Sequence, residues 1–193
     1  MDTPPILSIM IFLPLLCAFM IAFIRGEKGD DASVEKNIKS VALFMSTFVF
    51  IFGVFMYISF APNKEGFQFV EHYTWFGISG INYHLGVDGI SLYFILLSVF
   101  LTPICIIASW NSVKTRIKEY MIAFLVLESF MIGTFAALDS ILFYVFFEGV
   151  LIPMFLIIGV WGGPSRVYAS YKFFLYTLPV SYTHLRAHET KPN

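Results

Sequence analysis

The sequence predicts an all-α integral membrane protein, because three of its properties agree. Hydrophobic residues make up 58% of the 193 residues and charged residues 13%, whereas soluble domains average about 45–50% and 25%. Mean hydropathy is +0.79. Five stretches reach the roughly 20 apolar residues that a membrane-spanning helix needs. This composition excludes an ordinary soluble enzyme and a disordered chain, and the net charge of −1 excludes a nucleic-acid binder.

The five expected spans follow one another along the chain. No charged residue lies in the first span, and no basic segment precedes it, unlike a cleaved signal peptide. A sixth apolar run begins at Tyr171 and turns polar after about ten residues, which is too short to cross a bilayer. The complete spans are expected at Ile6–Ile24, Ile38–Ala61, Gly89–Ser109, Tyr120–Leu138 and Ser140–Trp161.

Basic residues alternate between successive segments outside the spans. Counted in order from the N-terminus, these segments carry 0, 4, 1, 3, 0 and 2 Lys or Arg residues, where the second count includes Lys39 and the last includes Lys172, each just inside the apolar run that follows. Cytoplasmic loops are the ones enriched in Lys and Arg. We therefore expect the N-terminus outside and the first, third and fifth loops on the cytoplasmic side.

The long second loop, residues 62–88, holds two histidines. His72 and His84 lie twelve positions apart, with Glu71 and Asp88 nearby. No tight ligand spacing supports a metal site. We expect an ordered external loop in which glycines make the turns, namely Gly77, Gly80 and Gly86.

Motifs for cofactor or nucleophilic chemistry are absent from the sequence. It has no Gly-rich phosphate loop, no Cys cluster and no nucleophile elbow. Cys17 and Cys105 both lie in apolar runs. We expect them to be packing residues rather than a disulfide or metal ligands.

Two carboxylates fall near the middle of predicted spans. Glu128 is in the fourth and Glu148 in the fifth, where a charge costs roughly 2.5–3.5 kcal/mol. Either they are protonated or their cationic partners lie elsewhere. Glu148 is followed by Gly149 and by Pro153, which frees a backbone carbonyl and favours a kink. This context favours an ion path, although Glu148 could instead hydrogen-bond a neighbouring helix.

Two further acidic residues stand at span boundaries. Asp88 precedes the third span and Asp139 the fifth. Acidic residues at these positions cap helix N-termini, and we expect that role for both. Glu128 could pair with a polar neighbour such as Ser129 instead of acting in a path.

Several motifs resemble the antiporter-like subunits of respiratory complex I (NADH:quinone oxidoreductase). The segment 85–92 with 101–103 is similar to their N-terminal signature. Residues 138–154, followed by 159–163 and 171–176, are more specific and resemble the chain M family, known as subunit 4 in mitochondria. The Phe-Phe-Glu148 stretch favours chain M over its paralogues.

This resemblance implies a fold of about fourteen transmembrane helices with two inverted repeats. Glu148 matches the family's fifth-helix Glu, which exchanges protons with a Lys on the seventh helix. Asp139, Gly149 and Pro153 match the surrounding motif. Glu128 lies outside the residues that the resemblance carries over, and its place in the fourth span predicts it as a second proton-path residue. No residue here matches the later Lys and His residues of the path.

The resemblance also implies the function and the setting. The chain would be a membrane subunit that couples electron transfer from NADH to quinone, in other subunits, to proton translocation. NADH, FMN, iron–sulfur clusters and quinone would be held elsewhere in the complex, and this chain would hold no cofactor or metal. Its partners would be the lipid bilayer and other membrane subunits, especially sister antiporter-like subunits, in a bacterial inner membrane with a periplasmic N-terminus, or in the mitochondrial inner membrane.

Two alternatives stay open on the sequence. The same fold occurs in multisubunit sodium/proton antiporters and in membrane-bound hydrogenases. A non-transporting membrane scaffold, in which Glu148 only packs, belongs to a different class.

The chain divides into three regions on this interpretation. Residues 1–88 hold two helices and the external loop, and residues 89–178 begin the proton-translocating domain with an incomplete sixth helix. In the last segment, residues 179–193, residues 180–190 resemble a translated sequencing adapter. We expect this segment to be a non-native tail on an N-terminal fragment, so His184, His188 and Glu189 are not taken as metal ligands. Without its cation partner, Glu148 is expected to be protonated.

Overall fold

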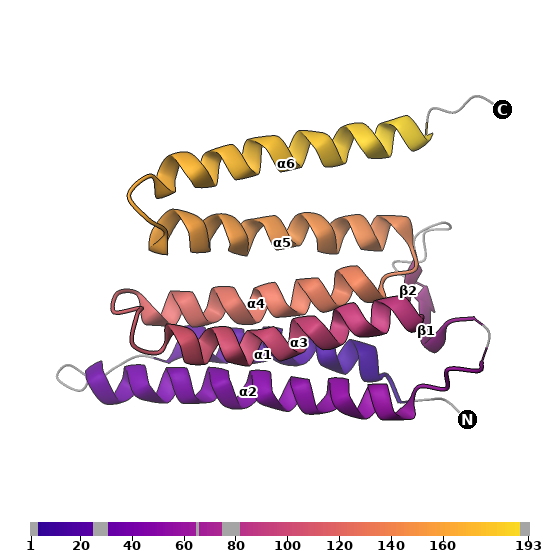
Figure 1. The fold of residues 1–193 in the computed structure, drawn as a ribbon, viewed down its shortest axis with the longest axis horizontal. Coiled ribbons are helices and arrows are strands. Elements are labelled where there is room, and N and C mark those ends of the chain that lie inside the picture. Colours follow the sequence, from indigo (N-terminus) through magenta and orange to yellow (C-terminus); the bar gives the residue numbers. More distant parts are fainter. Residues whose placement is uncertain (1–3, 25–30, 65, 75–81, 190–193) are drawn as a thin grey trace.

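The computed structural model describes residues 4–24, 31–64, 66–74 and 82–189, and it forms helices and a β-hairpin within these ranges (Figure 1). Five of the helices are long and apolar enough to cross a membrane, which confirms the five predicted spans. In chain order the elements are α1 (Ile6–Phe23), α2 (Asp31–Ser59), β1 (Gln68–Thr74), β2 (Asn82–Val87), α3 (Gly89–Ser109), α4 (Ile117–Ala136), α5 (Ser140–Trp161) and α6 (Arg166–Glu189).

Two helices have bounds that differ from the prediction by more than one residue. Helix α2 begins at Asp31 rather than Ile38, because a helix continues through polar residues where it leaves the apolar region. Helix α4 ends at Ala136 rather than Leu138. At this point the chain turns to pair with the hairpin: Ala137 forms a β-bridge with Leu85, and the Leu138 N–H donates to the His84 carbonyl at 2.9 Å.

Successive helices run in opposite directions, so that their ends gather at the two ends of the bundle, left and right in Figure 1. The connections α3–α4 and α5–α6 lie at one end, and the hairpin, the α4–α5 connection and the start of α1 lie at the other. Helix α1 packs most extensively on α4 and also contacts α2. Helix α5 packs on α4, and α6 packs on α5.

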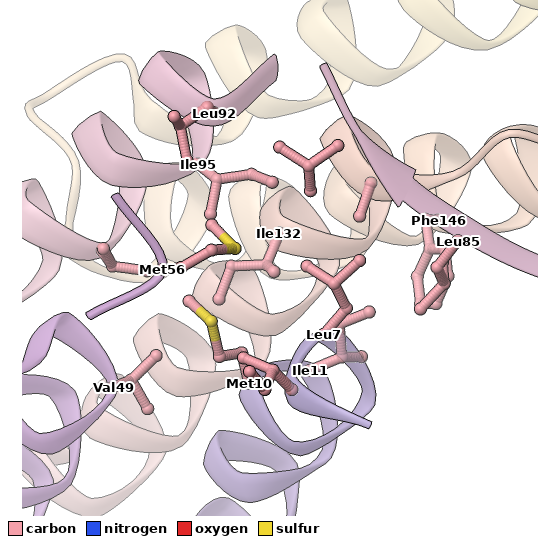
Figure 2. Packing of buried hydrophobic residues seen from close by; sticks show 14 of the residues in the cluster. Leu7, Met10, Ile11, Val49, Met56, Leu85, Leu92, Ile95, Ile132 and Phe146 are labelled. Carbon is pink, nitrogen blue, oxygen red and sulfur yellow. The ribbon is translucent and has the colours of Figure 1, made fainter. Parts of the chain in front are cut away.

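Two clusters of buried side chains form the core. The first lies toward the hairpin and joins α1, α2, β2, α3, α4 and α5 (Figure 2). It includes Leu7, Met10, Met56, Leu85, Ile95 and Ile132, none of which is exposed. The second lies toward the other end of α1 and α4 and contains Cys17. Both Cys17 and Cys105 are free thiols, as predicted.

The second loop is an antiparallel hairpin rather than an irregular loop. Its register pairs Glu71 with Leu85 and His72 with His84. Glu71 and its register partner Leu85 are buried, whereas His72, the next residue of β1, is exposed on the opposite face. Sequence reasoning missed the strands because one buried position is a carboxylate, which conceals the apolar alternation.

Gly86 does not make a turn, contrary to the prediction. It lies inside β2, where a Cβ would stand 2.7 Å from the Leu138 side chain. A strand glycine here permits close approach of the chain before α5. Gly77 and Gly80 lie outside the described residues.

Large apolar side chains remain exposed on the outer faces of the bundle. They lie along α1, α2, α3, α5 and α6 and include Met20, Phe44, Ile58, Tyr93, Ile107, Ile152 and Leu175. Of the five candidate spans, α5 is the least covered by the rest of the chain. Such surfaces suit lipid or neighbouring membrane helices.

Helix α6 is not among the candidate membrane spans of the described chain, in agreement with an apolar run too short to cross a bilayer. It continues to Glu189, through much of the segment expected to be a non-native tail. A native segment and a non-native segment can both be helical, so the expectation that residues 179–193 are a non-native tail stays a prediction.

Gly133 tests the packing of α4 against α5. A Cβ at this position would lie 2.5 Å from the Phe146 ring, so we expect Gly133→Ala to lower the free energy of unfolding by about 1–3 kcal/mol through overpacking. Gly89→Ala is the matched control, because a Cβ added there would meet open space out to 4 Å. Thermal unfolding of the purified chain in detergent measures both. Equal stability of the two variants would contradict the close α4–α5 contact.

Candidate functional site

Glu128 is the most deeply buried carboxyl group of a predicted site residue. It lies in the middle of α4 and is 1% exposed. Neither of its carboxyl oxygens has a hydrogen-bond partner among the described residues. The hydroxyl of Ser129 donates instead to the carbonyl of Ile11 on α1. Pairing of Glu128 with this polar neighbour, the simpler alternative, is therefore wrong.

The surroundings of Glu128 come mainly from the α1–α4 contact. The Cys17 thiol of α1 lies near enough to interact electrostatically with the carboxyl group. Leu125, Ser129 and Ile132 on α4 are all fully buried. A carboxyl group enclosed in this way, with no hydrogen-bond donor to it among the described residues, is a place where a proton can reside.

Glu148 lies in the middle of α5 and is partly buried. Its Oε1 atom is buried and has no hydrogen-bond partner in the described chain. Two residues nearby shape the helix. Gly149 permits close packing against α4, because a Cβ added at this position would lie 3.2 Å from the Phe130 ring. Pro153 is buried inside α5, where it leaves the Gly149 carbonyl without its usual helical donor.

Glu128 and Glu148 occupy neighbouring helices, but no hydrogen bond joins their carboxyl groups. Helices α4 and α5 pack against each other, yet both Glu128 oxygens lack a partner within the described ranges. The two carboxyl groups are therefore separate sites rather than a hydrogen-bonded pair.

Asp88 and Asp139 cap the two helices that they precede, as predicted. The Asp88 carboxylate accepts from Ser91 N–H at 2.7 Å, and the Ser91 hydroxyl accepts from Asp88 N–H at 3.0 Å, which completes a capping box. Asp139 accepts from the N–H groups of Ile141 and Leu142 at 2.9 and 3.1 Å. The hydrogen bonds to Ser91 lower the pKa of the Asp88 carboxyl.

Glu71 is a structural site that sequence reasoning missed. It is 5% exposed and accepts from Leu7 N–H at 2.7 Å and from Ser8 N–H at 3.1 Å. The Ser8 hydroxyl also donates to the carboxylate and lies 2.9 Å from the Tyr83 hydroxyl. Pro5, the residue before α1, offers no side-chain cap. That missing local cap is the signal that a distant acceptor is required.

Basic side chains satisfy carbonyl groups at the opposite ends of the same helices. Lys118 donates to the Ala22 carbonyl at 2.7 Å and the Ile24 carbonyl at 2.8 Å, at the end of α1. Lys39 donates to the Trp110 carbonyl at the end of α3, at 2.7 Å. Arg166 donates to the Val160 carbonyl at the end of α5, also at 2.7 Å. Cations at helix C-termini are favourable for the helix dipole.

Two sequence families match the chain in consecutive segments. The family described as NADH-ubiquinone oxidoreductase chain 4, amino terminus, matches residues 6–135. The family described as NADH:quinone oxidoreductase/Mrp antiporter, TM, matches residues 137–185. The second match extends into the segment 179–193.

Curated relatives agree with these matches. NADH-quinone oxidoreductase subunit M of Rhodobacter capsulatus is 52% identical over 172 residues, which are 89% of this chain and 33% of that protein. NADH-ubiquinone oxidoreductase chain 4 of Marchantia polymorpha is 48% identical over 173 residues, or 89% of this chain and 34% of that protein. The chain thus spans about a third of the length of these relatives.

Solved structures show the same fold at low identity. A chain of respiratory complex I from Thermus thermophilus aligns with a TM-score of 0.76 and 23% identity, over 94% of this chain and 34% of that chain. A chain of the archaeal membrane-bound sulfane sulfur reductase aligns with a TM-score of 0.72 and 18% identity, over 94% of this chain and 27% of that chain.

Replacement of Glu71 tests its role as a distant helix cap. Glu71→Ala leaves the Leu7 and Ser8 N–H groups without acceptors, so we expect the free energy of unfolding to fall by about 1–3 kcal/mol. Glu71→Gln keeps one acceptor oxygen and is expected to lose less. Denaturant unfolding in mixed micelles measures the difference. The cap role fails if Glu71→Ala is no less stable than the exposed control Glu119→Ala.

Asp88 generates a pH prediction with a defined sign. Because its folded pKa is lowered, its contribution is present above the unfolded value of about 3.9 and is lost as pH falls through the folded value. Asp88→Asn retains a capping acceptor without the charge. We therefore expect the parent's advantage over Asp88→Asn, measured by unfolding between pH 7 and pH 2, to shrink below about pH 4. The effect is small, because the partly exposed carboxylate is screened by solvent. A difference that does not change with pH would contradict the prediction.

Proposed function

The chain belongs to the family of NADH-ubiquinone oxidoreductase chain 4, and we propose that it acts in proton translocation as a membrane subunit of NADH:quinone oxidoreductase. The observation that carries this proposal is Glu148. Its Oε1 atom has no partner among the described residues, and it lies at the centre of a membrane-length helix, beside Gly149 and Pro153. Ionisable residues placed in this way mark ion and proton paths in membrane proteins.

Glu148 is the main proton-carrying residue in this proposal, and Glu128 is a second one. In the family pattern the fifth-helix Glu faces a Lys on a later helix, which lies beyond the segment that this chain matches. A proton held on Glu148 would move when that Lys changes its charge. Glu128 lies on the adjoining helix, and its oxygens too lack partners in the described chain, so it is suited to be a further resting place for a proton.

The redox chemistry is proposed to occur in other subunits. Among the described residues, no group of three or more His, Cys, Asp and Glu side chains could hold a metal ion. NADH, FMN, iron–sulfur clusters and quinone would be bound elsewhere in the complex. The contribution of this chain would be to position carboxyl groups inside the membrane.

The proposed setting follows from the charges at the two ends of the bundle. The basic caps Lys39, Lys118 and Arg166 share one end, which we assign to the cytoplasmic side. The hairpin and the N-terminus then face the periplasm of a bacterium, or the equivalent side of the mitochondrial inner membrane. The exposed apolar faces of α5 and α6 would contact lipid, sister antiporter-like subunits and further helices of the parent protein.

A second candidate function has its own support. The family that matches residues 137–185 includes Mrp antiporters, and the fold is shared with an archaeal membrane-bound reductase. The same carboxyl groups could then serve a sodium/proton antiporter or a membrane-bound hydrogenase. The 52% identity to subunit M over 89% of the chain favours NADH:quinone oxidoreductase.

Substitution of Glu148 in the assembled parent complex tests the proposal. Because Gln cannot carry a proton, we expect Glu148→Gln to lower NADH-driven proton translocation about tenfold or more. Glu128→Gln is expected to cause a smaller loss. Acidification of inverted membrane vesicles, measured with a pH-sensitive dye, gives the rates, and native gels confirm that the complex assembles.

Glu119→Gln is the matched control, because Glu119 is an exposed carboxylate on the first turn of α4. It should pump at the parent rate. A scaffold role predicts that Glu148→Gln also pumps at the parent rate in an assembled complex. That result would end the proton-path proposal. Dependence of transport on Na⁺ would favour the antiporter.

A further inference from the structure

The hairpin brings together two histidines that the sequence keeps twelve positions apart. His72 on β1 and His84 on β2 are direct register partners, and their ring centroids are 5.0 Å apart with the planes at 79°. His72 is exposed and His84 partly buried. Both project from the face opposite to Glu71 and Leu85, which are buried. We propose that His72 and His84 bind a divalent transition-metal ion such as Zn²⁺ or Cu²⁺.

The separation of the two rings fits a shared metal ion. With a metal–nitrogen bond of about 2.1 Å, each ring centroid lies about 3.2 Å from the ion, so a tetrahedral pair has centroids about 5.2 Å apart. The observed 5.0 Å matches this distance without any change in the strands. In the metal-bound form, one nitrogen of each ring would point at the ion.

The chemistry of the pair limits which ions it would take. Neutral imidazole is a ligand for Zn²⁺, Cu²⁺ and Ni²⁺, whereas Mg²⁺ and Ca²⁺ prefer oxygen ligands. No third His, Cys, Asp or Glu joins the pair within the described chain. Glu71, although adjacent to His72, accepts hydrogen bonds from α1 on the other face. Water would fill the remaining positions, and Cu²⁺ should bind more tightly than Zn²⁺.

A metal ion bound between His72 and His84 would stabilise the contacts that the hairpin makes with the starts of α1 and α5. Residue 71, next to His72, caps the start of α1. The His84 carbonyl accepts from the Leu138 N–H at 2.9 Å, just before Asp139 caps α5. A metal ion bound by both imidazoles would therefore link β1, which caps α1 through Glu71, to β2, which pairs with the chain just before α5. The inference does not rest on the proton-translocation proposal.

The test is metal titration of the complete, untagged chain in detergent. His184 and His188 are four positions apart in the sequence, so every sample carries H184Q/H188Q to remove that competing pair. Zn²⁺ binding is measured by calorimetry, and the ligands of bound Cu²⁺ by electron paramagnetic resonance. We expect one ion per chain, hyperfine coupling from two imidazole nitrogens, and a rise of a few degrees in unfolding temperature at saturating Zn²⁺.

His72→Gln and His84→Gln should each weaken binding about tenfold or more and abolish the rise in unfolding temperature. Asn82→Gln, in the same hairpin, should bind like the parent. Unfolding without metal shows whether each variant folds, and the resonance spectrum of the parent does not depend on any variant. The proposal is overturned if the parent binds no ion below about 1 mM, if the spectrum lacks two nitrogens, or if both His variants bind as the parent does.

Discussion

Each membrane helix exposes N–H groups at its start and carbonyl groups at its end, and the structure depends on satisfying them at the two ends of the bundle. Helices α1, α3 and α5 run in the same direction. Carboxylates satisfy their N-termini, from Glu71, Asp88 and Asp139. Cations satisfy their C-termini, from Lys118, Lys39 and Arg166. The charge asymmetry of the loops is therefore also the asymmetry of three aligned helix dipoles.

The hairpin contacts or leads into the N-terminal ends of all three of these helices. Its buried face supplies Glu71 to α1, its edge pairs with the chain before α5 through Leu85 and His84, and its last strand leads directly into the Asp88 cap of α3. Movement of the hairpin would therefore displace the starts of three spans together. Because α5 carries Glu148, the position of this carboxyl group in the membrane depends on contacts made at the hairpin.

The contrast between the ends and the middle of the bundle indicates where function resides. The six charged capping residues at the ends have hydrogen-bond partners, whereas the oxygens of Glu128 and the Oε1 of Glu148 have none among the described residues. Burial of an unpartnered carboxyl group is costly and adds nothing to packing. The presence of such groups at two central positions, one beside Gly149 and Pro153, supports the proposal that they hold a proton during transport.

The sequence by itself determined the class, the five spans, the Asp88 and Asp139 caps and the two central carboxyl groups, because each depends on local apolar runs or on residues within one helical turn. Only the tertiary structure decided the rest. Glu71 and the Leu7 N–H are 64 positions apart, and Ser129 bonds Ile11 rather than its neighbour Glu128. The His72–His84 pair depends on strand register. Such contacts are set by how helices and strands pack, and no local periodicity records that arrangement.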